Sequence, residues 1–284
     1  MPIDRVIVVD WSGRAARSPA RESKDAIWIG THGADGAVQT YFRSRAEAEL
    51  WLIRALAEGG RQLVGFDFPM GYPQGFARRL TGQDSARAVH DWLADRISDA
   101  PDNANNRFQV AGAINRQLGH PDRTIGPFWG RPKGLVVPHL PALKTVDYAA
   151  LGLAEKRQVE RENPPAKPVW QLMGAGSVGS QALLGIPVVH RIAQAFNAAI
   201  WPFEAPRVLT LAEVYPSLLA PAVTAAADPI PDRAQVRLLA RALFNLSKRG
   251  QLAPLLTTPP IAAEEGWILG AGHAPLLAEA LEWG

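Results

Sequence analysis

The chain has 284 residues and no cysteine, and it carries thirty basic against twenty-seven acidic residues, which gives a formal net charge of +3. The missing cysteine excludes a disulfide framework and thiolate catalysis. The small positive charge is compatible with an anionic substrate but does not demand nucleic acid. No apolar run is long enough to cross a bilayer and no signal peptide is recognised, so we expect a cytoplasmic protein that does not bind membranes.

The first predicted element is a buried strand that ends at an acid. The stretch Arg5 to Gly13 reads RVIVVDWSG, in which a β-branched run leads directly to Asp10 and is followed by Trp11 and Ser12. A short apolar run of this kind is typical of a strand buried on both faces. Because open α/β sheets bind ligands at the carboxyl ends of their strands, Asp10 is a candidate catalytic residue and Ser12 a candidate substrate contact.

A later predicted strand again carries an acid near its end. In chain order we expect strands at Asp25–Thr31 and Ala37–Phe42, a helix from its N-cap Ser44 to Ala57, and a strand at Gln62–Pro69. The last of these strands carries Asp67 between two phenylalanines. An isolated carboxylate between aromatic rings is costly to bury. A cation shared by Asp10 and Asp67 therefore explains both acids most economically.

The middle of the chain departs from this compact pattern. We interpret residues 76–205 as a mostly helical insertion that covers the site, set into a sheet domain formed by residues 1–75 and 206–284. Helices are predicted at Asp84–Ile97, Asn103–Leu118, Asp147–Glu162 and Gln181–Ile200, the last of them interrupted near Gly185–Pro187. The proline-rich part, Gly119–Leu143, predicts an ordered loop or lid beside the acids. The charged run KRQVERE, residues 156–162, is interpreted as a solvated helix face.

After the insertion the sheet resumes with a third acid. The segment Arg207–Pro216 predicts a strand with Glu213 near its end, and Asp232 begins a long amphipathic helix that stops before Gly250. Asp10, Asp67, Glu213 and Asp232 thus lie at comparable places, at strand ends or at the start of a helix beside the sheet. Carboxylate oxygens suit Mg²⁺ or Mn²⁺, and such ions can activate water for phosphodiester cleavage.

Four short motifs resemble an uncharacterised bacterial family of predicted nucleases with a ribonuclease H-like fold. They are VVDWSG, FDFP, EVYP and DRAQVRLLARAL. The resemblance covers the first 75 residues and roughly residues 205–250. It implies a mixed α/β sheet and a Mg²⁺-dependent hydrolase with Asp10, Asp67 and Asp232 as metal ligands and Glu213 as a ligand or water-orienting base. In that family the last helix usually carries a second Asp three residues after the first, where this chain has Gln235.

Other residues are candidates for contact with a phosphate. The segment Gly174–Gly179 reads GAGSVG, but it lacks the preceding strand and the following acid of a dinucleotide site, so we interpret it as a turn in which Ser177 and Ser180 face a phosphate over the acids. The main basic interval supplies a surface for a nucleic-acid backbone through Arg107, Arg116, Arg123, Arg131 and Lys133. Of these, Arg131 and Lys133 are the candidate substrate contacts.

Two other classes of function fit the same strand order. One is a phosphotransferase of the actin-like ATPase type, for which the phosphate hairpin after the first strand is too short. The other is a module that binds a nucleotide or nucleic acid without catalysis. The expected partner is nucleic acid or a phosphorylated small molecule, and the sequence leaves the oligomeric state open.

Overall fold

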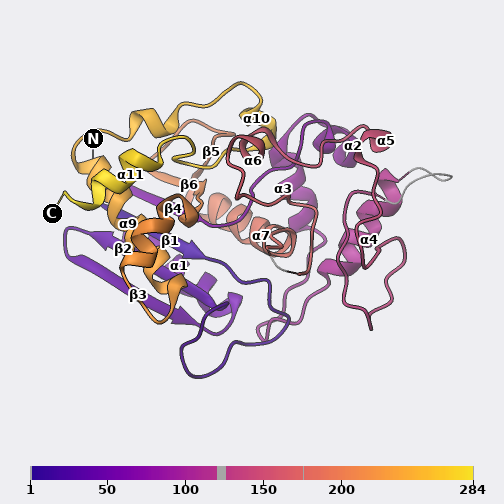
Figure 1. The fold of residues 1–284 in the computed structure, drawn as a ribbon, viewed down its shortest axis with the longest axis horizontal. Coiled ribbons are helices and arrows are strands. Elements are labelled where there is room, and N and C mark those ends of the chain that lie inside the picture. Colours follow the sequence, from indigo (N-terminus) through magenta and orange to yellow (C-terminus); the bar gives the residue numbers. More distant parts are fainter. Residues whose placement is uncertain (1, 120–125, 175, 284) are drawn as a thin grey trace.

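The computed structural model describes residues 2–119, 126–174 and 176–283. Its centre is a mixed sheet of six strands in the order β3-β2-β1-β4-β6-β5. The strands are β1 (Arg5–Asp10), β2 (Ile27–Gly33), β3 (Gly36–Phe42), β4 (Gln62–Phe66), β5 (Ala199–Trp201) and β6 (Leu209–Glu213). Figure 1 shows the sheet toward one end of the molecule, with α2, α4 and α5 of the insertion at the other end.

Strand β1 is central, as its sequence predicts. It pairs antiparallel with β2, with Val8 opposite Gly30, and parallel with β4, with Val8 opposite Gly65. The predicted strand at Asp25–Thr31 starts two residues later in the structure, at Ile27, but its pairing is the expected one. Strands β4, β6 and β5 continue the sheet in parallel. The chain is therefore an α/β protein with a mixed sheet.

Helices cover both faces of the sheet. They are α1 (Arg45–Ala57), α2 (Phe76–Thr81), α3 (Ala86–Ala94), α4 (Arg107–Leu118), α5 (Tyr148–Leu151), α6 (Gln158–Glu162), α7 (Gly179–Phe196), α8 (Ala220–Ala225), α9 (Pro231–Lys248), α10 (Ala262–Glu265) and α11 (Ala274–Leu281), with 3₁₀ turns at Pro216–Leu219 and Ala253–Leu256. None of the described helices combines the length and the apolarity that crossing a bilayer requires.

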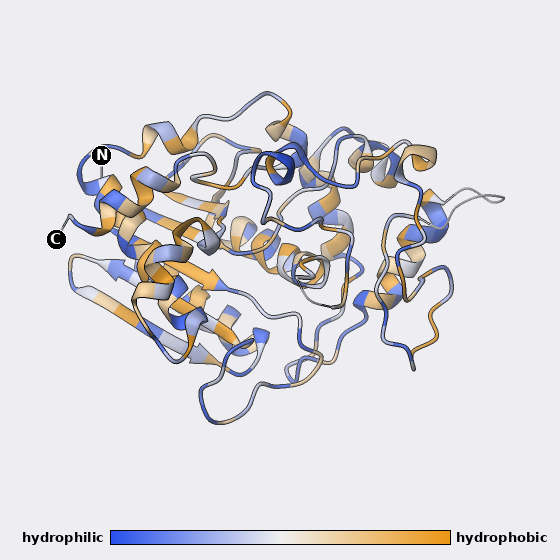
Figure 2. Cartoon of the chain, viewed as in Figure 1, coloured by the Kyte–Doolittle hydropathy of each residue, from blue (hydrophilic) through white to orange (hydrophobic). Residues whose placement is uncertain are grey.

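The alternation of side chains along β1 divides the core into two layers. Ile7 and Val9 pack with α1, α7 and the insertion on one face, whereas Val6 and Val8 pack with α9 and α11 on the other. Apolar residues accordingly follow the strands and much of α7 in Figure 2. A strand that is buried on both faces needs apolar residues at successive positions, which is why β1 reads as an unbroken apolar run.

Helix α9 lies directly on the hairpin of β1 and β2. A Cβ atom at Gly30 would lie 2.7 Å from the backbone carbon of Val236, so only glycine permits this approach without a shift of the backbone. The contact fixes the position of the helix one turn after its first acid. It therefore fixes where Asp232 lies relative to the end of β1.

The insertion differs from its prediction in three respects. The single helix predicted at Asp147–Glu162 is two short helices, α5 and α6, separated by residues 152–157. Residues Ala199–Trp201 fall within the predicted insertion, yet they form the edge strand β5 and pair with β6. Helix α7 runs without a break through Pro187, although the sequence suggested an interruption there. The sheet layer thus extends into the segment that the sequence assigned to the insertion.

Candidate functional site

Two acids meet at the carboxyl ends of adjacent strands. Asp10 is the last residue of β1 and Asp67 is the first residue after β4. The parallel register places Val9 opposite Phe66, and the Asp67 amide donates to the Val9 carbonyl at 3.1 Å. Since parallel strands of one register end at the same edge, the two carboxyl groups lie close enough for each to affect the pKa of the other. The structure thus places Asp10 and Asp67 at the same edge of the sheet, as the sequence predicts.

A third acid, Asp232, lies close to Asp10 but comes from helix α9 rather than from a strand. Asp232 lies in the first turn of α9, and its carboxylate accepts a hydrogen bond of 2.7 Å from the backbone amide of Asp25. Asp25 has a left-handed backbone conformation, with φ of 58°, and it precedes β2. The link between Asp25 and Asp232 closes the cluster on the side of the hairpin. Asp25 was not predicted, because its role comes from its backbone amide.

The environment of these acids favours their neutral forms. Burial raises the pKa of Asp10 well above its usual range, and the neighbouring Asp67 and Asp232 raise it further. Burial also raises the pKa of Asp67 to about 7, although the backbone amide of Trp11, which donates to its carboxylate at 2.7 Å, opposes the shift. Burial raises the pKa of Asp232 as well. No ion pair within the described chain neutralises any of the three.

The raised pKa of Asp67 predicts how stability depends on pH. Because Asp67 ionises at about 7 in the folded protein but at its ordinary value of 3.8 when unfolded, the protein loses stability as the pH rises from 3.8 to about 7, and the loss levels off above that pH. Asp67→Asn does not titrate and keeps an oxygen to accept from Trp11. Without added metal, we expect the variant to become more stable than the wild type by about 1–3 kcal/mol above pH 7.

Thermal unfolding of both proteins between pH 5 and 8.5 measures this difference. The gap in Tm should open as the pH rises and then level off. Asp35→Asn, in the exposed turn after β2, removes a carboxylate elsewhere and should give no gap at any pH. A difference in Tm that becomes smaller as the pH rises would contradict the raised pKa of Asp67.

Asp10 and Asp232 line a cavity of about 470 Å³ at this edge of the sheet, whereas Asp67 is not among its described lining residues. Its walls come from the loop after β1, from the residues just before β2, from the start of α4, and from the loop before α7. The lining residues used below are Asp10, Ser12, Asp25, Arg107, Ser177, Ser180, Gln181 and Asp232. A cavity of about 480 Å³ at the opposite end of the strands, around Leu63 and Thr210, has no acidic side chain among its described lining residues.

The predicted serines line the cavity, but two of their hydroxyl groups are already engaged. The Ser12 hydroxyl donates to the Asp25 carbonyl at 3.1 Å. The Ser180 hydroxyl donates to the Leu172 carbonyl at 2.5 Å and accepts from Arg107 at 2.8 Å. Ser12 and Ser180 therefore hold the walls in place, and of the three serines Ser177 keeps the predicted role of a substrate contact.

Glu213 does not join the other acids. Its carboxylate accepts two hydrogen bonds from the Arg157 guanidinium, at 2.8 and 2.6 Å, and one of 3.0 Å from the backbone amide of Met70. Arg157 is fully buried and also pairs with Glu160. The prediction that Glu213 faces the shared cleft is wrong, because a buried cation of the chain already neutralises it. The prediction of a solvated KRQVERE face is likewise wrong at Arg157 and Glu160.

The proline-rich segment supports the cavity wall from behind. Trp129 exchanges backbone hydrogen bonds with Trp170 and Leu172, which precede the loop at the cavity. The Arg131 guanidinium donates to the carbonyls of Leu140 and Leu135. Neither Arg131 nor Lys133 is among the described lining residues, so their predicted contact with substrate is not supported at this cavity. Part of this segment, residues 120–125, lies outside the described residues.

No described group of three or more His, Asp or Glu side chains is arranged to hold a metal ion by itself. Comparisons of the chain with protein-family models, with curated proteins and with solved structures found no match. The assignment of this site therefore depends on its own residues.

Proposed function

We propose that the protein is a Mg²⁺-dependent phosphodiester hydrolase, nuclease-like in its chemistry, with Asp10, Asp67 and Asp232 as its carboxylates. One observation carries the proposal. Two carboxyl groups stand side by side at the ends of adjacent parallel strands, a third is close enough to raise the pKa of the first, and no described basic side chain pairs with any of them. Such a cluster is costly unless a cation or protons relieve it.

The strand order supports a ribonuclease H-like architecture for the sheet. A meander of three antiparallel strands is followed by α1 and by a strand that returns parallel to β1. The acids lie at the carboxyl edge of the two central strands, where open α/β sheets bind their ligands. This placement motivates the assignment of that fold, which the motifs VVDWSG and FDFP also suggest.

The residues present fit Mg²⁺ or Mn²⁺. Mg²⁺ keeps several water ligands and is commonly bound by one or two carboxylates together with substrate phosphates. Asp10 and Asp67 would hold the ion, and Asp232 would contribute a further carboxylate to the metal site. Because no described group of three such side chains is arranged to hold an ion by itself, water and substrate phosphate would have to supply the remaining ligands. When bound, the ion would lower the pKa of a bound water and offset charge on the phosphate.

The chain's own groups divide the remaining work. The Trp11 amide holds the Asp67 carboxylate in place, and the Asp25 amide holds that of Asp232. Asp232 lines the cavity and has a raised pKa, so it is the carboxylate placed to accept a proton from attacking water. Glu213 has no part in proton transfer in this proposal, since its carboxylate is occupied by two hydrogen bonds from Arg157 and one from the Met70 amide.

Incubation with defined phosphodiesters tests the function. The purified protein would be mixed with single- and double-stranded DNA, RNA and bis(4-nitrophenyl) phosphate, with Mg²⁺, Mn²⁺ or EDTA. We expect metal-dependent cleavage that EDTA abolishes, and metal-dependent thermal stabilisation above pH 7. Absence of both turnover and stabilisation would reject the hydrolase and leave a binding module, whereas transfer of phosphate from ATP would favour the phosphotransferase.

A further inference from the structure

Arg107 is a buried cation without a carboxylate partner. It is the first residue of α4, its exposed fraction is 7%, and it lines the cavity that contains Asp10. Its Nε donates to the Ser180 hydroxyl at 2.8 Å and its Nη1 donates to the Asn105 side-chain oxygen at 2.7 Å. Among the described residues it forms no ion pair. Three of the five guanidinium N–H groups thus have no protein acceptor in the described chain.

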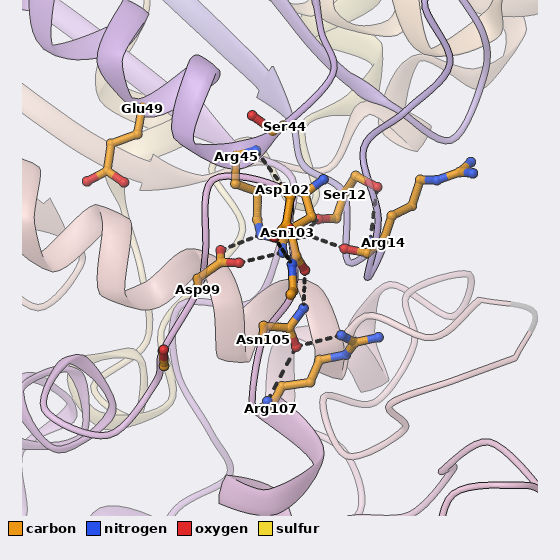
Figure 3. A network of polar contacts seen from close by, with 12 residues as sticks. Ser12, Arg14, Ser44, Arg45, Glu49, Asp99, Asp102, Asn103, Asn105 and Arg107 are labelled. Atoms are coloured by element: carbon orange, nitrogen blue, oxygen red, sulfur yellow. Dashed lines mark hydrogen bonds and ion pairs between the residues drawn. The ribbon is translucent and has the colours of Figure 1, made fainter.

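A neighbouring arginine shows what a satisfied guanidinium looks like in this protein. Arg45 forms five hydrogen bonds, two with the Asp99 carboxylate and three with the carbonyls of Ser12, Arg14 and Asn103. These account for all five of its donors. In Figure 3 the ends of Arg45 and Arg107 lie on the two sides of Asn103 and Asn105, and Asp99 reaches Arg45. Asp99 therefore pairs with Arg45, and Arg107 has no carboxylate partner among the described residues.

The surroundings of Arg107 hold it ready for an anion. Ser180 fixes its Nε and belongs to the first turn of α7, an 18-residue helix whose positive end faces the same cavity. The guanidinium lies over the Phe108 ring at 4.3 Å, which covers one face and leaves the edges for hydrogen bonds. Helix starts of this kind bind phosphate groups through backbone amides and the dipole. A planar guanidinium binds phosphate through two parallel hydrogen bonds.

We propose that Arg107 and the first turn of α7 form a phosphate-binding subsite, distinct from the acids, that receives a phosphate adjacent to the scissile one. The statement that this phosphate neighbours the scissile one rests on the proposed hydrolase function. The statement that Arg107 binds a phosphate is independent of that function. The substrate class that carries two neighbouring phosphates along one chain is a nucleic-acid strand. A cavity of about 470 Å³ has the size of a small-ligand site, so one strand enters it and a double helix does not.

Phosphate binding without metal tests the subsite directly. Inorganic phosphate would be titrated into the protein in EDTA and binding followed by the rise in Tm. We expect Arg107→Gln to weaken phosphate binding at least tenfold. Arg107→Lys, which keeps the charge but loses the planar fork, should show an intermediate loss. Arg54→Gln removes the same charge from the exposed face of α1 and serves as the matched control, with unchanged binding. Equal phosphate binding by Arg107→Gln and the wild type would overturn the subsite.

A pair of substrates then tests the neighbouring phosphate. A 5′-phosphorylated dinucleotide carries two phosphates, whereas bis(4-nitrophenyl) phosphate carries one. Arg107→Gln should lower kcat/KM for the dinucleotide at least tenfold more than for the single phosphodiester, and the control Arg54→Gln should change neither. Equal losses on both substrates would contradict the role in substrate selection. If the wild type binds phosphate through Arg107 but cleaves neither substrate, the subsite stands and the hydrolase proposal fails.

Discussion

Asp10→Asn is expected to abolish phosphodiester cleavage and to raise the stability of the protein above pH 7. The amide keeps the size of the side chain and an oxygen, but it removes the charge of the residue that joins Asp67 and Asp232. The loss of several kcal/mol of metal-assisted stabilisation of the transition state corresponds to a fall in kcat of about 10³-fold or more. Removal of a like charge from a buried cluster relieves repulsion, which is why stability should rise as activity disappears.

Two measurements separate this outcome from simple damage to the fold. The Tm at pH 8 without metal should increase in Asp10→Asn, and the further increase produced by Mn²⁺ in the wild type should vanish. Asp35→Asn, in the exposed turn, should keep both the activity and the response to Mn²⁺. An Asp10→Asn protein that retains cleavage would show that the acids meet for structural reasons, and one that loses Tm would show that Asp10 stabilises the strand ends.

Arg157→Met is expected to cause the largest loss of stability. Arg157 is fully buried and pairs with both Glu160 and Glu213, so its removal leaves two buried carboxylates without a cation. Breaking a buried pair from one side typically costs about 3–5 kcal/mol. For a chain of this length we expect Tm to fall by about 6–10 °C. Arg161→Met, on the exposed face of the same short helix, should shift stability by less than about 0.5 kcal/mol.

The double variant Arg157→Met with Glu213→Gln distinguishes a structural role from a catalytic one. If Glu213 serves only this ion pair, the double variant should recover part of the lost Tm and retain cleavage at a temperature where it is folded. Loss of cleavage without loss of Tm in Glu213→Gln alone would return Glu213 to the catalytic set.

Local sequence was sufficient for the elements that carry the acids. An unbroken apolar run reports a strand buried on both faces, and the acid that ends it must then lie at the edge of the sheet. This reasoning identified β1, its hairpin and the meeting of Asp10 with Asp67. It also identified Asp232, because a long amphipathic helix has a recognisable start.

Ion pairs between segments that are distant in the chain could not be predicted from local sequence. Glu213 ends a buried strand as Asp67 follows one, and nothing beside it in sequence shows that Arg157, 56 positions earlier, lies against it. Arg157 sits in a run of alternating charges that is typical of a solvated surface. Arg107 belonged to a basic interval of five residues. It differs from Arg116 and Arg131 because it is buried and has no carboxylate partner among the described residues. That difference arises because Asp99 pairs with Arg45, a contact that the sequence does not reveal.

The hydrogen bonds of Arg45 bear on how the proposed hydrolase would turn over. This one buried side chain joins the Ser12 and Arg14 carbonyls, in the loop after β1, to Asp99 and Asn103 of the insertion. A hinged closure of the insertion over the acids would have to break these bonds together and leave a guanidinium without acceptors. For the proposed hydrolase we therefore expect a cavity that keeps one shape during turnover. The rate of turnover should be governed by chemistry or by the departure of product, rather than by gating of a moving domain.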